Sequence, residues 1–327
     1  GRIIVTHYNE PWEVARPFFD ILGAQKSVDF SKIKVWLIQD GPCVSIFPPG
    51  YFVGSPLGHS IENFETVTIP HGGVSAARNA GIDRADAEWI CFCDCDDAFS
   101  SVYSLKILFY ILRNEQPYDL MWNKFYKNYL DEDDTLDIET EYNHVWIHNK
   151  YYRLSFLREH NIRFPEGIFM SEDSAFNNVV ELEIGENRIG QINTEWPLYC
   201  WLRRRGSVTT DPDRYYRNIE GHFQRNLWVL NEYRKRKIKR SPFVVARTLT
   251  DVYSFITRYP EKYENEEYKK IMGLLSEFYQ KEKGIYRNLK KEFKELALQA
   301  SEREAGVLGM DIPGKPTMKE WLKELCT

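Results

Sequence analysis

The N-terminal part of the chain alternates short apolar segments with helix-like segments, and this alternation limits the possible folds more than any other feature. Four apolar runs have the length of strands, at residues 2–6, 34–38, 65–69 and 89–93. Helical patterns occupy 11–22 and 75–85, whereas Pro and Gly interrupt 42–59 and predict a loop there. Strands that alternate with helices form parallel sheets with right-handed crossovers. The sequence therefore predicts an α/β fold with a mainly parallel sheet flanked by helices.

A polar cluster follows each of these strands. The clusters are Thr6-His7-Tyr8-Asn9, Gln39-Asp40-Gly41, His71-Gly72-Gly73 and Asp94-Cys95-Asp96. The carboxyl ends of parallel strands meet at one edge of a sheet, and ligands bind outside that edge. The four loops are therefore expected to contribute to one binding site.

The run from Trp89 to Asp97 is an apolar strand that ends in three carboxylates. Because side chains alternate along a strand, Asp94 and Asp96 are expected on one face and the three cysteines of the run on the other. Neighbouring carboxylates repel each other unless a cation lies between them. Mg²⁺ and Mn²⁺ favour such oxygen ligands and complete their coordination with substrate phosphates. The run predicts a metal–diphosphate site, and its simpler interpretation is an acidic turn after a strand.

The cysteine pattern indicates core residues in a reducing compartment. Cys91, Cys93 and Cys95 alternate along one strand, where neighbours two residues apart are badly placed for a disulfide. A zinc site is the alternative, although the usual C-x-x-C spacing is missing. No apolar run approaches the roughly 18–20 residues of a membrane span, and no signal peptide precedes the first strand. We expect a cytoplasmic protein, with the inner face of the cell membrane as a further location.

The C-terminal part differs from the rest in pattern and charge. From Asp211 onward the chain reads as mostly helical, with 24 Lys and Arg against 18 Asp and Glu, whereas the whole chain has a net charge of −5. We therefore expect a catalytic domain over 1–210 and a helical region over 211–327 that contacts the acceptor or a partner. The basic segment 234–240 is interpreted either as a solvated helix end or as a contact for an anionic acceptor or membrane surface. An acidic stretch at 131–141 is expected to be an exposed loop.

The order of the motifs matches a known family. The motifs are Thr6-His7-Tyr8-Asn9, Asp40-Gly41, Gly72-Gly73 followed by Ser75-Ala76-Ala77-Arg78-Asn79-Ala80-Gly81, Asp94-Cys95-Asp96-Asp97, Asn161 to Gly167, Glu172-Asp173-Ser174-Ala175-Phe176, and Trp201 to Thr209. This series resembles family-2 inverting glycosyltransferases of the GT-A fold, of the bacterial type. The resemblance extends to about residue 210 and leaves the C-terminal helices uncovered. It implies a Rossmann-like GT-A domain, and the helical pattern from Asp211 onward adds a C-terminal α-helical appendage to that expectation.

The resemblance also implies which residues bind the nucleotide sugar. They are Thr6, Tyr8, Asn9, Asp40, His71, Arg78, Asp94, Cys95, Asp96, Arg203 and Arg205. Tyr8 offers a stacking face for the base, although it could be a packing residue. Asp40 matches an acid that accepts a base N–H, or else belongs to a turn before Gly. Arg78 matches a bidentate donor to base or phosphate, with a surface salt bridge as its alternative. The family commonly has an acid in place of Gln39 and Asn in place of His71.

The same resemblance implies the metal ligands and the catalytic groups. Asp96 and Asp94 would hold Mn²⁺ or Mg²⁺, which neutralises charge on the leaving nucleoside diphosphate. Arg203 and Arg205 resemble basic residues that close over the diphosphate, or else are solvated. Asp173 matches the general base that takes a proton from the acceptor hydroxyl. Glu172 would orient the acceptor or the backbone, and helix capping is the alternative for this acidic pair.

The sequence therefore predicts an inverting, metal-dependent enzyme that moves a sugar from a nucleotide-diphosphate sugar, UDP-linked, to a hydroxyl of a glycan, polysaccharide or glycolipid-like acceptor of the cell surface. A non-catalytic sugar-nucleotide-binding scaffold with a degenerate transferase domain is the alternative. A nucleotidyltransferase is disfavoured because the loop after the first strand is neither Gly-rich nor basic. Nucleic acid is not an expected partner, because the basic residues do not lie in a recognisable binding motif.

Overall fold

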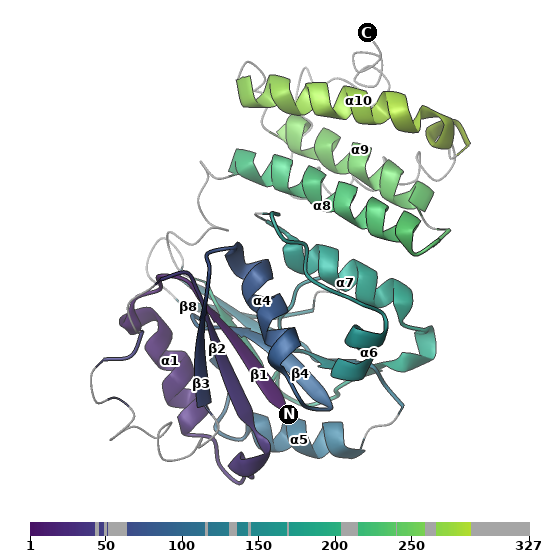
Figure 1. Ribbon diagram of the computed structural model, residues 1–327. Helices are drawn as coiled ribbons and strands as arrows, with labels where there is room; N and C mark the ends of the chain where they lie inside the picture. The colour runs from purple at the N-terminus through teal and green to yellow at the C-terminus, as the bar shows by residue number, and fades with distance from the viewer. Residues whose placement is uncertain are drawn as a thin grey trace. The chain divides into compact units, whose positions relative to one another are not determined.

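The computed structural model describes residues 1–42, 46–48, 51, 64–114, 117–130, 136–142, 145–168, 170–203, 215–239, 241–258 and 266–288 (Figure 1). The chain divides into two compact units. The sheet unit comprises Gly1–Gly167 and Glu172–Thr210, and the helical unit comprises Ile168–Ser171 and Asp211–Thr327. A four-residue segment from the middle of the sequence thus belongs with the C-terminal helices.

The sheet unit is built on a seven-stranded sheet with the strand order β10-β6-β9-β4-β1-β2-β3. The strands are β1 (Arg2–His7), β2 (Lys34–Asp40), β3 (Phe64–Ile69), β4 (Trp89–Asp94), β6 (Leu120–Trp122), β9 (Lys150–Arg153) and β10 (Ile189–Gln191). All neighbouring pairs are parallel except those of β9, which runs antiparallel to β4 and β6. The predicted mixed, mainly parallel α/β fold is confirmed.

A second sheet contains four strands in the order β5-β11-β7-β8. They are β5 (Ala98–Phe99), β7 (Phe125–Leu130), β8 (Leu136–Glu141) and β11 (Tyr199–Leu202). The expectation of a loop over 131–141 is wrong for its second half, because β8 pairs antiparallel with β7 along its whole length. This polar segment has no apolar pattern that would predict a strand. It forms one because pairing with β7 supplies its backbone hydrogen bonds.

Helices pack on both faces of the central sheet. The helices of this unit are α1 (Trp12–Gly23), α4 (Gly73–Arg84), α5 (Ser104–Asn114), α6 (Leu154–Glu159) and α7 (Glu172–Glu183), with 3₁₀ turns at Phe30–Lys32 and Glu186–Arg188. On one face, Phe18 of α1 and Leu108 of α5 share a core with the buried Cys91, Cys93 and Cys95. The expected core role of these cysteines agrees with this placement. Among the described residues, no cysteine belongs to a cluster of metal-binding side chains.

The opposite face carries the residues that alternate with these cysteines. Phe92 of β4 contacts Phe176 of α7, and α4 packs on β1 and β2 (Figure 1). Gly81 brings α4 directly onto Ile4, because any side chain at that position would collide with Ile4. Asp94 continues the series of Phe92, so the end of β4 presents its carboxylate on the face that α4 and α7 cover.

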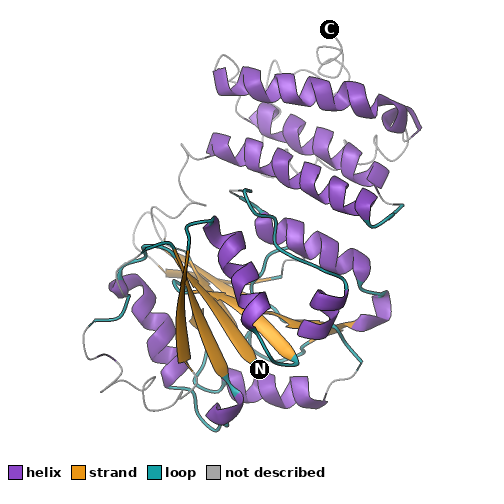
Figure 2. Cartoon of the chain, in the orientation of Figure 1, coloured by secondary structure: helices purple, strands orange, loops and turns teal. Residues whose placement is uncertain are grey.

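The described part of the helical unit consists of three long helices, which Figure 2 draws in purple. They are α8 (Tyr215–Lys235), α9 (Ser241–Arg258) and α10 (Glu266–Asn288). α9 packs against both α8 and α10, and Phe223, Leu249 and Leu275 are buried. Within the described part of the chain, no helix combines the length and the apolar character that a membrane span requires.

Candidate active site

The ends of β1 and β4 meet in register, and this pairing places the first two site residues together. Thr6 pairs with Asp94 in the sheet, and its hydroxyl Oγ1 donates a hydrogen bond to Asp94 Oδ1 at 3.0 Å. Thr6 is buried, and the contact of its hydroxyl is with Asp94. The sequence expectation that Thr6 and Asp94 belong to one site agrees with this geometry.

Arg78 of α4 is the cation at the centre of the site. Its Nη2 donates to Asp94 Oδ1 at 3.0 Å and its Nη1 to Glu172 Oε1 at 2.7 Å. Burial alone would lower the pKa of the guanidinium, but Asp94 and Glu172 outweigh burial and raise it. Burial likewise raises the pKa of Asp94, and the charge of Arg78 reverses that effect and lowers it. A surface salt bridge was the alternative interpretation of Arg78 from the sequence. Arg78 does form salt bridges, but it is buried rather than exposed.

Asp173 lies beside this ion-pair network in the first turn of α7. Burial and then the charge of Glu172 raise the pKa of Asp173 to about 7, while Arg78 and Lys150 act in the opposite direction. Asp173 Oδ1 accepts a hydrogen bond from the backbone N–H of Ser174 at 2.6 Å. The carboxyl is thus held at the helix start with a pKa near neutrality, as a proton acceptor requires.

A second acidic group lies just beyond β4. Asp94, Asp97 and His148 have potential ligand atoms that all lie within 4.8 Å of one another. Asp97 is 2% exposed and accepts hydrogen bonds from the Tyr199 hydroxyl at 2.7 Å and from the backbone N–H of Leu202 at 3.0 Å. Burial, then Asp96 and Asp94, raises the pKa of Asp97 well above its usual range.

His148 was not found by sequence reasoning. Burial lowers the pKa of His148 to about 4, so its imidazole is neutral, and its Nδ1 lies 3.6 Å from Asp97 Oδ2 without a hydrogen bond. The ring stacks on Tyr199 and Trp201, with centroids 5.9 and 5.2 Å apart. No motif marks a histidine that follows Trp146-Ile147 on the way into β9, so only the fold could reveal it.

The strand-face argument for the acidic run holds for Asp94 but not for Asp96. β4 ends at Asp94, and Asp96 follows in a turn, where side chains no longer alternate. Asp97 lies with Asp94 and His148 in a cluster of potential metal ligands. The metal assignment of Asp96 stays a prediction.

A platform of two rings lies at the ends of β1 and β3. Tyr8 and His71 stack with centroids 4.6 Å apart and an interplanar angle of 18°, and Tyr8 is 48% exposed. Asp40 fixes the loop beneath, because its carboxylate accepts the backbone N–H groups of Gly72 at 2.7 Å and Gly73 at 2.9 Å. His71 Nδ1 lies 2.9 Å from the same carboxylate. Asp40 thus ties the N-terminus of α4 to β2, in addition to any contact with a nucleotide.

The remaining predicted nucleotide residues differ in their placement. The side chain of Cys95 lies in the core with its Sγ 3.5 Å from Glu10 Oε2, and its backbone N–H donates to Thr6 O, so its contact with a nucleotide stays a prediction. Asn9 is exposed and adopts a left-handed backbone with φ 60°. Arg203 follows β11, with its guanidinium 5.6 Å from the centre of the Trp201 ring. Arg205 lies outside the described residues.

A mainly parallel α/β sheet with an acidic, arginine-centred site at its carboxyl edge is typical of transferases that use nucleotide sugars. The profile of glycosyl transferase family 2 matches residues 2–177. The chain belongs to this family and is a glycosyltransferase. No curated protein matched the sequence.

Solved structures support the fold at low sequence identity. Residues 1–349 of TarS from S. aureus, in complex with UDP-GlcNAc, align with a TM-score of 0.63 and 17% identity over 96% of this chain and 97% of that chain. The complex of the same TarS fragment with UDP aligns with a TM-score of 0.56 and 17% identity over 98% of both chains. A longer TarS structure aligns with a TM-score of 0.58 and 18% identity, and there this chain covers 48% of the TarS chain. The GT-A fold therefore extends to this protein.

Proposed function

We propose that the protein is an inverting, metal-dependent glycosyltransferase that uses a UDP-linked sugar and a hydroxyl acceptor of a glycan, polysaccharide or glycolipid-like molecule. The observation that carries this proposal is the position of Asp173. A carboxyl group with a pKa of about 7 lies one residue from Glu172, which is bound to Arg78 and through it to Asp94 at the carboxyl edge of the sheet.

The donor proposal rests on the ring platform and on the structural neighbours. The exposed faces of Tyr8 and His71 suit stacking against a nucleotide base. Asp40 accepts the backbone N–H groups of Gly72 and Gly73 beneath these rings and so fixes the loop that carries His71. TarS, which shares the fold, binds UDP and UDP-GlcNAc in the structures named above. A UDP-linked donor is therefore the first choice for this chain.

The acidic cluster suits a divalent cation. Carboxylate oxygens are ligands for both Mn²⁺ and Mg²⁺, and a neutral imidazole is a ligand for transition-metal ions, which favours Mn²⁺ over Mg²⁺ here. His148 Nδ1 is buried without a hydrogen-bond partner. Burial, and then the charges of Asp96 and Asp94, raise the pKa of Asp97, and a bound cation would offset this cost of ionising the carboxyl. Asp94, Asp97 and His148 would hold the ion, with Asp96 in the adjoining turn. A bound metal would stabilise charge on the leaving diphosphate.

The residues of the chain perform the other steps. Asp173 accepts the proton of the acceptor hydroxyl as that oxygen attacks the anomeric carbon, and the bond to the nucleotide diphosphate breaks on the opposite side. Glu172 and Arg78 hold the start of α7 at Asp94, so the base stays close to the donor end of the site. One base is sufficient for inversion in a single displacement.

A donor panel with and without Mn²⁺ tests this proposal. We expect hydrolysis or transfer with a UDP-sugar and metal, and proton NMR of the first-formed product should show the anomeric configuration opposite to that of the donor. Asp173→Asn should lower turnover by roughly 10²–10⁴-fold and leave UDP binding intact. Retention of configuration, or full turnover in Asp173→Asn, would contradict the proposed mechanism.

A further inference from the structure

Asn177 lies on the same helix as the candidate base, one turn further along. Residues four apart on a helix share a face, so Asp173 and Asn177 are neighbours along α7. Asn177 has an exposed fraction of 0%. A buried amide needs partners for its oxygen and its N–H groups, because an unpaired polar group in the interior is costly. The partners of Asn177 therefore identify the parts of the sheet unit that this turn of α7 is tied to.

The amide of Asn177 makes hydrogen bonds in two directions. Its Oδ1 accepts from the Tyr152 hydroxyl of β9 at 2.7 Å. Its Nδ2 donates to the backbone carbonyls of Val145 at 2.9 Å and Trp146 at 3.2 Å, and Lys150 Nζ also donates to Trp146 O. Backbone carbonyls can only accept, so they fix the orientation of the amide. Asn177 thus links α7 to β9 and to the main chain that leads into β9.

The segment that Asn177 holds also carries the histidine of the acidic cluster. Residues 145–149 belong to no helix or strand, so side chains supply partners for their backbone groups. Asn177 binds the first two residues of this segment. At the other end, Asn149 Nδ2 donates to Lys124 O at 2.6 Å. His148 lies between these two fixed points.

We propose that Asn177 is a positioning residue that holds Asp173 and His148 in one arrangement. Glu172 fixes the start of α7 through its 2.7 Å contact with Arg78, and Asn177 fixes the next turn against the segment of His148. The base is thereby kept in place relative to the candidate metal ligands. Displacement at the anomeric carbon requires such control, because the attacking hydroxyl and the leaving diphosphate must be aligned. This inference rests on the proposed function.

Two neighbouring asparagines on α7 provide a matched test. Asn177→Leu replaces the buried amide by a side chain of similar size that donates no hydrogen bond. At saturating Mn²⁺ it should lower kcat by roughly 10–100-fold, because misplacing catalytic groups by about 1 Å has an effect of this size. KM for the UDP-sugar should change little. The control is Asn178→Leu, which makes the same change at a partly exposed position of the same helix and should retain wild-type kcat.

Mn²⁺ binding gives a readout that requires no activity. Electron paramagnetic resonance of the substrate-free protein should show an affinity about 10-fold weaker in Asn177→Leu, because groups that orient metal ligands have effects of this size. Asn177→Ser is the milder variant, since its short side chain loses the two carbonyls without forcing an apolar group against them. It should lower kcat and Mn²⁺ affinity in the same direction.

Tyr152→Phe separates positioning from stability. This change removes the hydroxyl that Asn177 accepts from, but it leaves both donations to the main chain in place. It should lower the melting temperature and retain wild-type kcat and Mn²⁺ affinity. In hydrogen exchange of the whole protein, amides 146–148 should exchange faster in Asn177→Ser than in Tyr152→Phe or the wild type.

The outcomes distinguish this inference from the proposed function. Wild-type kcat, Mn²⁺ affinity and exchange in both Asn177 variants, with turnover lost in Asp173→Asn, would overturn the inference and leave the proposed function standing. Equal losses of kcat in Tyr152→Phe or Asn178→Leu would also overturn it, because Asn177 would then matter only for folding. Wild-type turnover in Asp173→Asn would overturn the proposed function, and the positioning role with it.

Discussion

The two units differ in whether their buried polar groups have hydrogen-bond partners. In the helical unit, Arg225 Nη2 contacts Asp251 Oδ2 at 2.7 Å, and Asn226 donates to the same oxygen at 3.0 Å. In the sheet unit, Arg78 Nε and His148 Nδ1 are buried without partners, and among the described residues every such atom lies in this unit. Satisfied networks stabilise and specify a fold, whereas unsatisfied buried groups accompany binding or catalysis. Within the described residues, the buried polar atoms without partners thus lie in the same unit as the candidate site.

Two matched arginine variants test this comparison most strongly. Arg78→Met leaves Asp94 and Glu172 without their buried cation, so we expect a loss of about 3–5 kcal/mol in unfolding free energy together with loss of UDP binding and transfer. Arg225→Met should destabilise the helical unit through Asp251 and leave UDP binding unchanged. Denaturant unfolding and calorimetry measure both. Loss of UDP binding in Arg225→Met would break the comparison.

The pH dependence of turnover sharpens the role of Asp173. Its pKa of about 7 means that the base form is lost as pH falls, so kcat should drop about 10-fold per pH unit below 7, or about 100-fold at pH 5. Stability has the opposite sign, because the folded pKa lies above the unfolded value. The Asp173 contribution therefore becomes destabilising as pH rises from about 4 to about 7.

Thermal unfolding of Asp173→Asn checks that sign. The variant should be more stable than the wild type at pH 8, and the difference should vanish near pH 4. Equal melting temperatures of variant and wild type at both pH values would show that Asp173 is solvated and that its pKa is not raised.

Measurements of metal binding test the cluster of Asp94, Asp97 and His148, which the sequence alone did not predict. His148→Ala should weaken Mn²⁺ binding by about 10-fold or more, measured by electron paramagnetic resonance without any substrate. Asp94→Asn should weaken it further. His160→Ala serves as the control, because His160 pairs with Glu183 on α7, away from the cluster. If Mn²⁺ affinity is unchanged in His148→Ala but lost in Asp96→Asn, Asp96 rather than His148 is a ligand of the metal.

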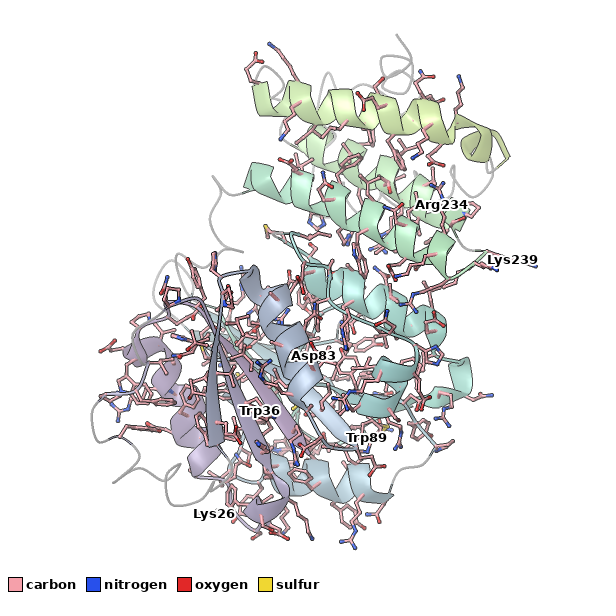
Figure 3. All side chains as sticks on the ribbon, viewed as in Figure 1. Lys26, Trp36, Asp83, Trp89, Arg234 and Lys239 are labelled. Carbon is pink, nitrogen blue, oxygen red and sulfur yellow. The ribbon has the colours of Figure 1, made fainter. Side chains whose placement is uncertain are left out.

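The smallest effect is expected from the basic segment 234–240. Arg234 is paired with Glu282 at 2.6 Å and Arg236 with Glu232 at 3.0 Å. Figure 3 labels Arg234 near the end of α8 and Lys239 just beyond it. The cationic residues of the segment are therefore partly neutralised within the unit, which favours the helix-end interpretation. Replacing the exposed Lys235, Lys237 and Lys239 with Ser should leave UDP binding and transfer unchanged at physiological salt. Reduced acceptor use or liposome association, strongest at low salt, would instead support an anionic contact.

The sequence by itself determined the mainly parallel sheet and the edge at which the site forms. Strand-length apolar runs, each followed by a polar cluster, are local patterns, and Thr6 and Asp94 lie in register because their strands end there. Glu172 and Asp173 were predicted from the motif order of the family, because an acidic pair at a helix start by itself suggests helix capping. The cysteines of β4 were placed on their core face by strand alternation alone.

Only the tertiary structure decided which distant side chains complete the site. Asp97 lies beside Asp94 just beyond the end of β4, and His148 joins them from the approach to β9. Arg78 became the buried partner of two carboxylates through the close packing of α4 on Ile4 at Gly81. The assignment of Ile168–Ser171 to the helical unit depends on contacts more than fifty residues apart. Such contacts leave no local periodicity, because a side chain's distant neighbours are set by packing rather than by its own sequence.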